Sequence, residues 1–103
     1  MKKSGEAIAA YKKAIEAKPE HVEAYNNLGI IYTGLGQNTE AIALYQKVIE
    51  IDPGYARGYN NLAILHLRVK QYDRAIYYCD TAAELGSVNP ELAEALKPYR
   101  EKP

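Results

Sequence analysis

The sequence predicts an all-α protein, an array of antiparallel helix pairs with about six helices. The first observation is that the 103-residue chain repeats a pattern of aromatic and small residues at a fixed offset of thirty-four residues. The second is that apolar residues recur at three-and-four spacing, the period of a helix. The third is that glycine, proline and asparagine interrupt these segments at regular intervals. A repeat of this length predicts a solenoid whose stacked units bury a shared core.

The repeat is clearest between residues 25–53 and residues 59–87. Its aromatic and small positions match as Tyr25 with Tyr59, Leu28 with Leu62, Gly29 with Ala63, Tyr32 with His66, and Ala41 with Ala75. Its identical positions match as Asn26 and Asn27 with Asn60 and Asn61, Ile30 with Ile64, Gln37 with Gln71, Ile42 with Ile76, and Glu50 with Glu84. This many coincidences at one offset indicate an internal duplication.

The order Tyr25-x2-Leu28-Gly29-x2-Tyr32, followed by Ala41 and Pro53, closely resembles the tetratricopeptide repeat. That family is built from a helix-turn-helix unit of thirty-four residues. The resemblance implies a right-handed superhelical array, or α-solenoid, that holds other polypeptides and is not an enzyme. We expect one domain over 1–103: the second helix of a partial repeat (1–21), two full repeats (22–55 and 56–89), and a capping helix with a tail (90–103).

The first predicted helix runs from about Ser4 to Ala17. Its apolar residues lie thirty-four residues before those of the next second helix, so Tyr11 corresponds to Tyr45. The chain therefore opens in the second half of a repeat. We expect its start either to be cut from a longer array or to be completed by another molecule.

The two full units follow the same plan, with a turn between two helices. In the helix expected from Val22 to Leu35, the residues that recur at three-and-four spacing form one face, and this face is expected to pack in the core. Turns are predicted at residues 35–38 and 69–71, and Asp52-Pro53-Gly54 ends the first unit. The second unit lacks the proline but keeps Gly86, a residue suited to a helix C-terminus.

The last predicted helix has well-marked ends. Asn89 can cap it, Pro90 suits its first position and Glu91 complements the helix dipole. Leu92 and Leu96 give it an apolar stripe, while its outer side is polar, as expected of a helix that closes a repeat array. A proline at position 98 is expected to end or kink it.

Composition narrows the class of function. Thirteen basic and thirteen acidic side chains cancel, which argues against nucleic acid or an anionic membrane as the main partner. The longest apolar run, Leu28–Tyr32, is too short to span a bilayer. Cys79 is the single cysteine, so no intrachain disulfide forms. The compartment stays open: the cytoplasm is favoured, and the periplasm is an alternative if an upstream signal exists.

The resemblance places binding on the inner face of each first helix, opposite the core face. The candidate peptide-binding residues there are Glu23, Asn27 and Ile30 in one unit and Arg57, Asn61, Ile64, Leu67 and Arg68 in the next. A side-chain amide offers both a donor and an acceptor, so Asn27 and Asn61 can clamp the backbone of an extended peptide. The alternative is that both asparagines bond to neighbouring helix ends. For the apolar residues, the alternative is contact between adjacent first helices.

A more specific use in this family is a carboxylate clamp for the acidic C-terminus of heat-shock chaperones. Asn26 and Ile30 stand where that clamp wants Lys and Asn, so the resemblance fails in detail. Arg57 and Arg68 still favour a ligand with acidic character, because a guanidinium pairs bidentately with a carboxylate. Equally, both are compatible with solvated surface arginines.

Self-assembly is the alternative function. The first predicted helix has no partner helix before it in the chain, and its apolar residues include Ile8, Tyr11 and Ile15. An uncovered apolar face tends to find a mate. Two chains could therefore form a homodimer through this helix.

No enzyme activity, metal or cofactor is expected. Two histidines and one cysteine are too few for a structural zinc site, which needs four ligands. His66 and Cys79 stand where the other repeats have tyrosine, so both are expected in or near the core between helices. A Cys-His nucleophile pair would need an accessible cleft, which the pattern does not supply. Tyr77 is expected to point outward, away from the inner face.

Overall fold

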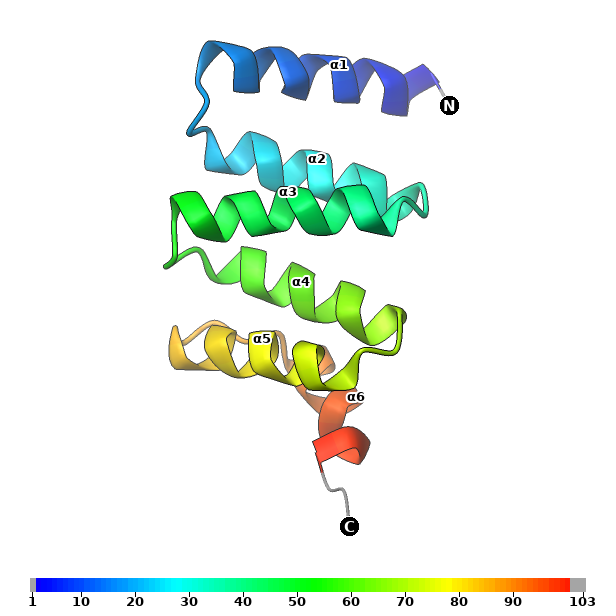
Figure 1. The fold of residues 1–103 in the computed structure, drawn as a ribbon, viewed down its shortest axis with the longest axis vertical. Helices are drawn as coiled ribbons and strands as arrows, with labels where there is room; N and C mark the ends of the chain where they lie inside the picture. The colour runs from blue at the N-terminus through cyan, green and yellow to red at the C-terminus, as the bar shows by residue number, and fades with distance from the viewer. Residues whose placement is uncertain (1, 101–103) are drawn as a thin grey trace. The chain divides into compact units, whose positions relative to one another are not determined.

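The structure is a computed structural model that describes residues 2–100, and the side chains of residues 4–100. The described residues form helices joined by turns: α1 (Lys2–Ala17), α2 (Val22–Gly34), α3 (Asn38–Ile51), α4 (Ala56–Arg68), α5 (Tyr72–Glu84) and α6 (Pro90–Arg100) (Figure 1). The prediction of an all-α fold with about six helices is confirmed over the described residues. The expected tail after residue 100 lies outside the described residues.

The chain divides into two compact units, Met1–Pro53 and Gly54–Pro103. The described part of unit 1 holds α1, α2 and α3, and that of unit 2 holds α4, α5 and α6. The boundary falls at the Asp52-Pro53-Gly54 stretch, where the sequence predicted the end of the first full repeat. Each unit is therefore described by itself.

Unit 1 is built on the α2–α3 hairpin, and α1 packs against α2 (Figure 1). The core of the hairpin is fully buried and consists of Ala24, Leu28, Ala41, Tyr45 and Val48. Gly29 lies against the ring of Tyr45 so closely that an added Cβ would stand 2.6 Å from Tyr45 Cε1. A side chain at position 29 would therefore push the ring away, because real Cβ atoms do not come so near.

Unit 2 is built on the α4–α5 hairpin, and α6 packs against both helices (Figure 1). Its buried cluster comprises Ala63, Ala75, Cys79, Leu92 and Leu96. Because two of these five residues belong to α6, this helix is part of the core and not an appended tail. The predicted role of the last helix as a cover for the α4–α5 pair fits this contact.

Three helices end in the same hydrogen-bonded turn, in which a residue with positive φ follows the last helical residues. After α2 this residue is Gly36 (φ 78°), and the next amide, that of Gln37, donates to Tyr32 O at 2.9 Å. After α5 it is Gly86 (φ 81°), as the sequence predicted. After α4, however, the same place is held by Lys70 (φ 64°), a conformation that costs energy for a residue with a Cβ.

The start of α6 follows the prediction, but its end does not. Asn89 Oδ1 accepts hydrogen bonds from the amides of Glu91 (2.9 Å) and Leu92 (3.3 Å), so Asn89 is the N-cap. Of the two outcomes expected at Pro98, an end or a kink, the end is wrong, because α6 continues through that residue to Arg100. Contacts of the last turn with α5 favour the continuation: Tyr99 stacks on Tyr72, and Arg100 pairs with Asp80.

Candidate binding surface

The solvent-facing side of α2 carries the three candidate residues of unit 1. Glu23 is exposed, Asn27 is half-buried, and Ile30 is 49% exposed. Ile30 is unusual, because its neighbours Leu28 and Gly29 are buried in the core of the hairpin. An apolar side chain is therefore held in solvent by a helix whose opposite face is packed. Thr33 lies further along the helix, but its hydroxyl donates to Gly29 O at 2.8 Å.

The five candidates on α4 divide into polar and apolar positions. Arg57 and Arg68 are exposed, and Asn61 is half-buried. The guanidinium of Arg57 lies 5.1 Å from the centre of the Tyr55 ring, a cation–π contact that restricts its side chain. Ile64 and Leu67 are half-buried against the cluster that includes Leu92 and Leu96 of α6. They thus present only part of their surface to solvent.

Asn60, next to the candidate Asn61, has a structural role within unit 2. Its Nδ2 donates to Ser87 O at 2.7 Å, and its Oδ1 accepts from the Asn89 amide at 3.0 Å. One side chain thereby joins α4 to the turn that leads into α6. Asn60 thus shows the kind of bond to a neighbouring helix end that the sequence offered as the alternative for Asn61.

His66 and Cys79 lie inside unit 2, 2% and 1% exposed, which agrees with the expectation that both lie in or near the core. His66 Nδ1 is 2.7 Å from Gln71 Oε1, and because an amide oxygen can only accept, Nδ1 carries the proton. The imidazole ring also stacks on Tyr78, with centroids 5.4 Å apart. Cys79 is not reachable by a substrate at this burial, which removes the access that nucleophilic catalysis requires.

Tyr77 points away from the core, as predicted, and is 65% exposed. It meets the half-buried Tyr78 edge to face, with ring centroids 5.2 Å apart. Within residues 2–100, no group of three or more His, Cys, Asp or Glu side chains could hold a metal ion. The same residues include no helix long and apolar enough to cross a bilayer.

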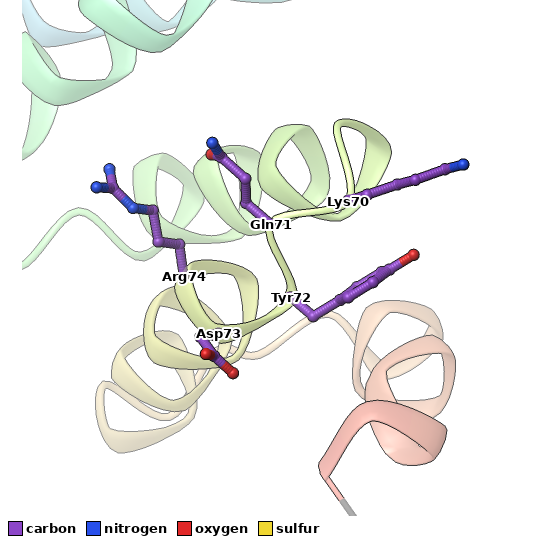
Figure 2. A pocket seen from close by; sticks show the side chains of 5 residues that line it. All are labelled: Lys70, Gln71, Tyr72, Asp73 and Arg74. Atoms are coloured by element: carbon purple, nitrogen blue, oxygen red, sulfur yellow. The ribbon is translucent and has the colours of Figure 1, made fainter. Parts of the chain in front are cut away.

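A hollow of about 330 Å³ lies beside the α4–α5 turn, and the sequence did not point to it. It is lined by Lys70, Gln71, Tyr72, Asp73 and Arg74. Figure 2 shows Lys70 and Tyr72 extended to the same side of the turn, and Arg74 directed away from them. The hollow is formed by consecutive residues of the turn and of the start of α5, so a pattern of spaced motifs could not have revealed it.

Tyr72 also contacts the last turn of α6 that the structure describes. Its ring stacks on that of Tyr99 with centroids 3.8 Å apart and planes inclined by 5°. A hydrogen bond with Tyr72 is the main cause that raises the pKa of Tyr99 above its usual value. The pair of Arg100 with Asp80 (2.6 Å) raises the pKa of the Arg100 guanidinium. Both contacts fix α6 on α5.

Comparison with sequence families gives two matches, both described as tetratricopeptide repeat. One covers residues 2–56, more than half of the chain, and the other covers residues 44–77. The chain belongs to the tetratricopeptide repeat family. A comparison with curated proteins gave no match.

Several solved structures share the tetratricopeptide fold of this chain. MamA is 31% identical with a TM-score of 0.79, and the match covers 82% of this chain and 49% of MamA. YrrB, described as a TPR protein with an unusual peptide-binding site, is 26% identical with a TM-score of 0.79, covering 84% of this chain and 45% of YrrB. This chain thus spans about half the length of either protein.

The first TPR of Spaghetti (RPAP3), solved with the HSP90 peptide SRMEEVD, has a TM-score of 0.87. The match covers 95% of this chain and 78% of that one. At 20% identity this likeness concerns the fold alone.

Proposed function

We propose that this chain is a non-enzymatic protein–protein interaction scaffold that binds an extended peptide segment through the solvent-facing sides of its first helices. Each unit contributes one such side, with Glu23, Asn27 and Ile30 on α2 and the corresponding residues on α4. The observation that carries the proposal is the 49% exposure of Ile30 on a helix whose Ala24, Leu28 and Gly29 are buried. YrrB, which is 26% identical and described as a TPR protein with an unusual peptide-binding site, supports the same class of function.

The polar residues suit an extended backbone as ligand. Asn27 and Asn61 each carry one donor group and one acceptor, so each can bond a peptide N–H and C=O without selecting a side chain. Ile30 then offers an apolar contact for a ligand side chain. With two amides and few apolar contacts, the affinity should be modest, on the order of micromolar.

The acidic tail of a chaperone is a poor candidate for this ligand. Asn26 is 1% exposed and therefore cannot take the place of the lysine that the carboxylate clamp uses. Ile30 stands where the clamp wants an asparagine. We expect the peptide SRMEEVD to bind this chain no better than a scrambled version.

The test is a selection of peptides from a random dodecapeptide display library, followed by calorimetric titration of a selected peptide. The double variant Asn27→Ala, Asn61→Ala should bind it roughly 5- to 150-fold more weakly, since a net loss of about 0.5–1.5 kcal/mol at each of the two amides totals about 1–3 kcal/mol. The control Gln46→Ala removes an exposed amide from α3 and should leave the affinity unchanged. If the double variant binds as tightly as the parent chain, the two amides do not contact the peptide and this assignment is wrong.

A second candidate function is self-association through α1, because that helix keeps a half-exposed apolar face. Ile8, Tyr11 and Ile15 are all only partly buried, and no residue of α1 from Ser4 onward is fully buried. A concentration series by light scattering separates this candidate from a purely monomeric scaffold. A constant monomer mass at high concentration would eliminate it.

A further inference from the structure

The face of α1 that includes Tyr11 is less covered than the same face of α3 and α5. Three positions hold the same repeat register in these helices: Ala7, Tyr11 and Ala14 in α1, Ala41, Tyr45 and Val48 in α3, and Ala75, Cys79 and Ala82 in α5. In α3 and α5 these residues are at most 2% exposed. In α1 all three are only partly buried. The equivalent face is thus buried in α3 and α5 and partly exposed in α1.

A helix that covers this face must carry a small residue at the point where it crosses the tyrosine ring. In unit 1 the face of α3 is covered by α2, whose Gly29 leaves no room for a Cβ against the ring of Tyr45. Tyr11 is the same residue type in the same register. A helix packing on Tyr11 therefore needs glycine or alanine where it crosses the ring, since a larger side chain would hold the helices apart.

Helix α1 itself meets this requirement, whereas α6 does not. Alanines at positions 7, 10 and 14 follow each other at steps of three and four beside the tyrosine, so they line one side of the helix. In α6 the place of Gly29 and Ala63 is taken by Lys97, an exposed residue paired with Glu94 at 2.8 Å. Placing α6 of a second copy on this face would press a charged side chain against Tyr11.

Within residues 4–17, the open face also carries no charged side chain. The partly buried residues of α1 are Ser4, Ala7, Ile8, Tyr11, Ala14 and Ile15. The charged side chains within the described part of this helix, Glu6, Lys12, Lys13 and Glu16, are all exposed. Because the face is apolar and contains both a large residue and small ones, two copies of it are complementary to each other. Such self-complementarity is what a two-fold interface requires.

We propose that α1 is the contact surface of a weak two-fold homodimer, in which two α1 helices pack antiparallel and Tyr11 of each copy lies over the alanines of the other. This rests on the second candidate function and specifies its geometry. The antiparallel arrangement opposes the helix dipoles. A pair of helices about 24 Å long buries less area than the roughly 1,200 Å² of a stable interface. The dissociation constant is therefore expected on the order of 100 µM.

The experiment compares two variants with the same substitution on different sides of α1. Ala7→Glu places a charge on the proposed interface, and Ala9→Glu places it on an exposed position two residues away. Sedimentation equilibrium from about 10 µM to 1 mM brackets the expected dissociation constant. The average mass of the parent and of Ala9→Glu should rise from 11.5 kDa towards twice that value. Ala7→Glu should stay at the monomer mass, with an unchanged helical circular dichroism spectrum.

Should Ala7→Glu lose helicity, Ala10→Glu replaces it, because Ala10 is exposed in the monomer and its substitution disturbs no core contact. A parent chain that remains at 11.5 kDa throughout would overturn both self-association and this geometry. Association that persists in Ala7→Glu and Ala10→Glu would overturn the α1 interface alone. Neither result bears on peptide binding, which is measured separately through the asparagine variants.

Discussion

The two units solve one packing problem in opposite ways. Where the first and second helices of a hairpin cross, unit 1 places Gly29 against Tyr45, and unit 2 places Ala63 in the same cluster as Cys79. In unit 1, the large Tyr45 of the second helix lies against glycine, the smallest residue, on the first helix. In unit 2, the smaller Cys79 of the second helix shares its cluster with alanine, which has a Cβ, on the first helix. The crossing therefore constrains the pair of residues together, and neither position can be interpreted alone.

The largest expected effect on stability comes from removing the large side chain at the point where the two hairpin helices of unit 1 cross. Tyr45→Cys places the residue of unit 2 into unit 1 and removes a tyrosine that is 2% exposed and whose hydroxyl lies 3.3 Å from the Thr33 hydroxyl. We expect a loss of about 3–5 kcal/mol in unfolding free energy, as for other large-to-small core changes. Urea denaturation followed by circular dichroism measures it. A loss below about 1 kcal/mol would mean that the crossing collapses freely.

The next largest effect on stability comes from adding a side chain at the point where these two helices cross. Gly29→Ala should cost about 1–3 kcal/mol in the parent chain, because the new Cβ would lie 2.6 Å from Tyr45 Cε1. In the Tyr45→Cys background the same change should be neutral or stabilising by up to about 1 kcal/mol, since alanine favours helices over glycine. Unfolding free energies of the four chains of this cycle give the coupling between the positions.

This cycle tests the comparison between the units directly. A cost of Gly29→Ala that is the same in both backgrounds would show that the positions are independent. The conclusion that the crossing constrains the pair would then be wrong. Gly34→Ala is a matched control, because nothing lies within 4 Å of a Cβ added at that helix end.

A smaller effect is expected at the asparagine that joins α4 to the start of α6. Asn60→Ala removes the hydrogen bonds to Ser87 O and from the Asn89 amide, and we expect a loss of about 1–2 kcal/mol in the stability of unit 2. Amide hydrogen exchange in α6 reports that loss locally. Asn27→Ala on α2 serves as the control, with an expected change within about 0.5 kcal/mol. Equal protection of α6 in the parent and in Asn60→Ala would contradict the structural role.

The smallest effect concerns the turn that each hairpin shares. Gly36 and Lys70 hold the same place with positive φ, but only glycine adopts this conformation without strain. Lys70→Gly should stabilise the chain by about 1 kcal/mol, and the reciprocal Gly36→Lys should destabilise it by about the same amount. The midpoint of thermal unfolding measures both changes. A Lys70→Gly chain with a lower midpoint would indicate that the lysine makes contacts that outweigh its backbone strain.

Much of the fold was predictable because the repeat samples each helix type more than once. Helix boundaries agreed within about two residues, apart from the end of α6, and Gly86 and Asn89 took their predicted places at helix ends. The continuation of α6 past Pro98 was not predictable, because it depends on contacts of Tyr99 and Arg100 with residues of α5. Local sequence rules describe a helix by itself and not the surface on which it lies.

The candidate binding surface was predictable only in part. The outward face of α2 follows from periodicity, and the exposure of Ile30 agrees with it. The equivalent Ile64 is half-buried on the cluster that α6 completes, although the two residues are identical and share one register. Likewise, the sequence presents Asn60 and Asn61 side by side, and only the tertiary contacts distinguish the residue that holds α6. The role of Asn27 and Asn61 in peptide binding stays a prediction.

The sequence by itself determined the repeat, the family, the helices and the faces they bury, because the three-and-four spacing and the turn residues act locally. The tertiary structure decided which repeated positions are equivalent in their surroundings. Ile30 and Ile64, Tyr11 and Tyr45, and Gly36 and Lys70 are matched in sequence, yet they differ in burial or in strain. The reason is physical: burial depends on which helix lies opposite, and a repeat specifies the residue but not its neighbour.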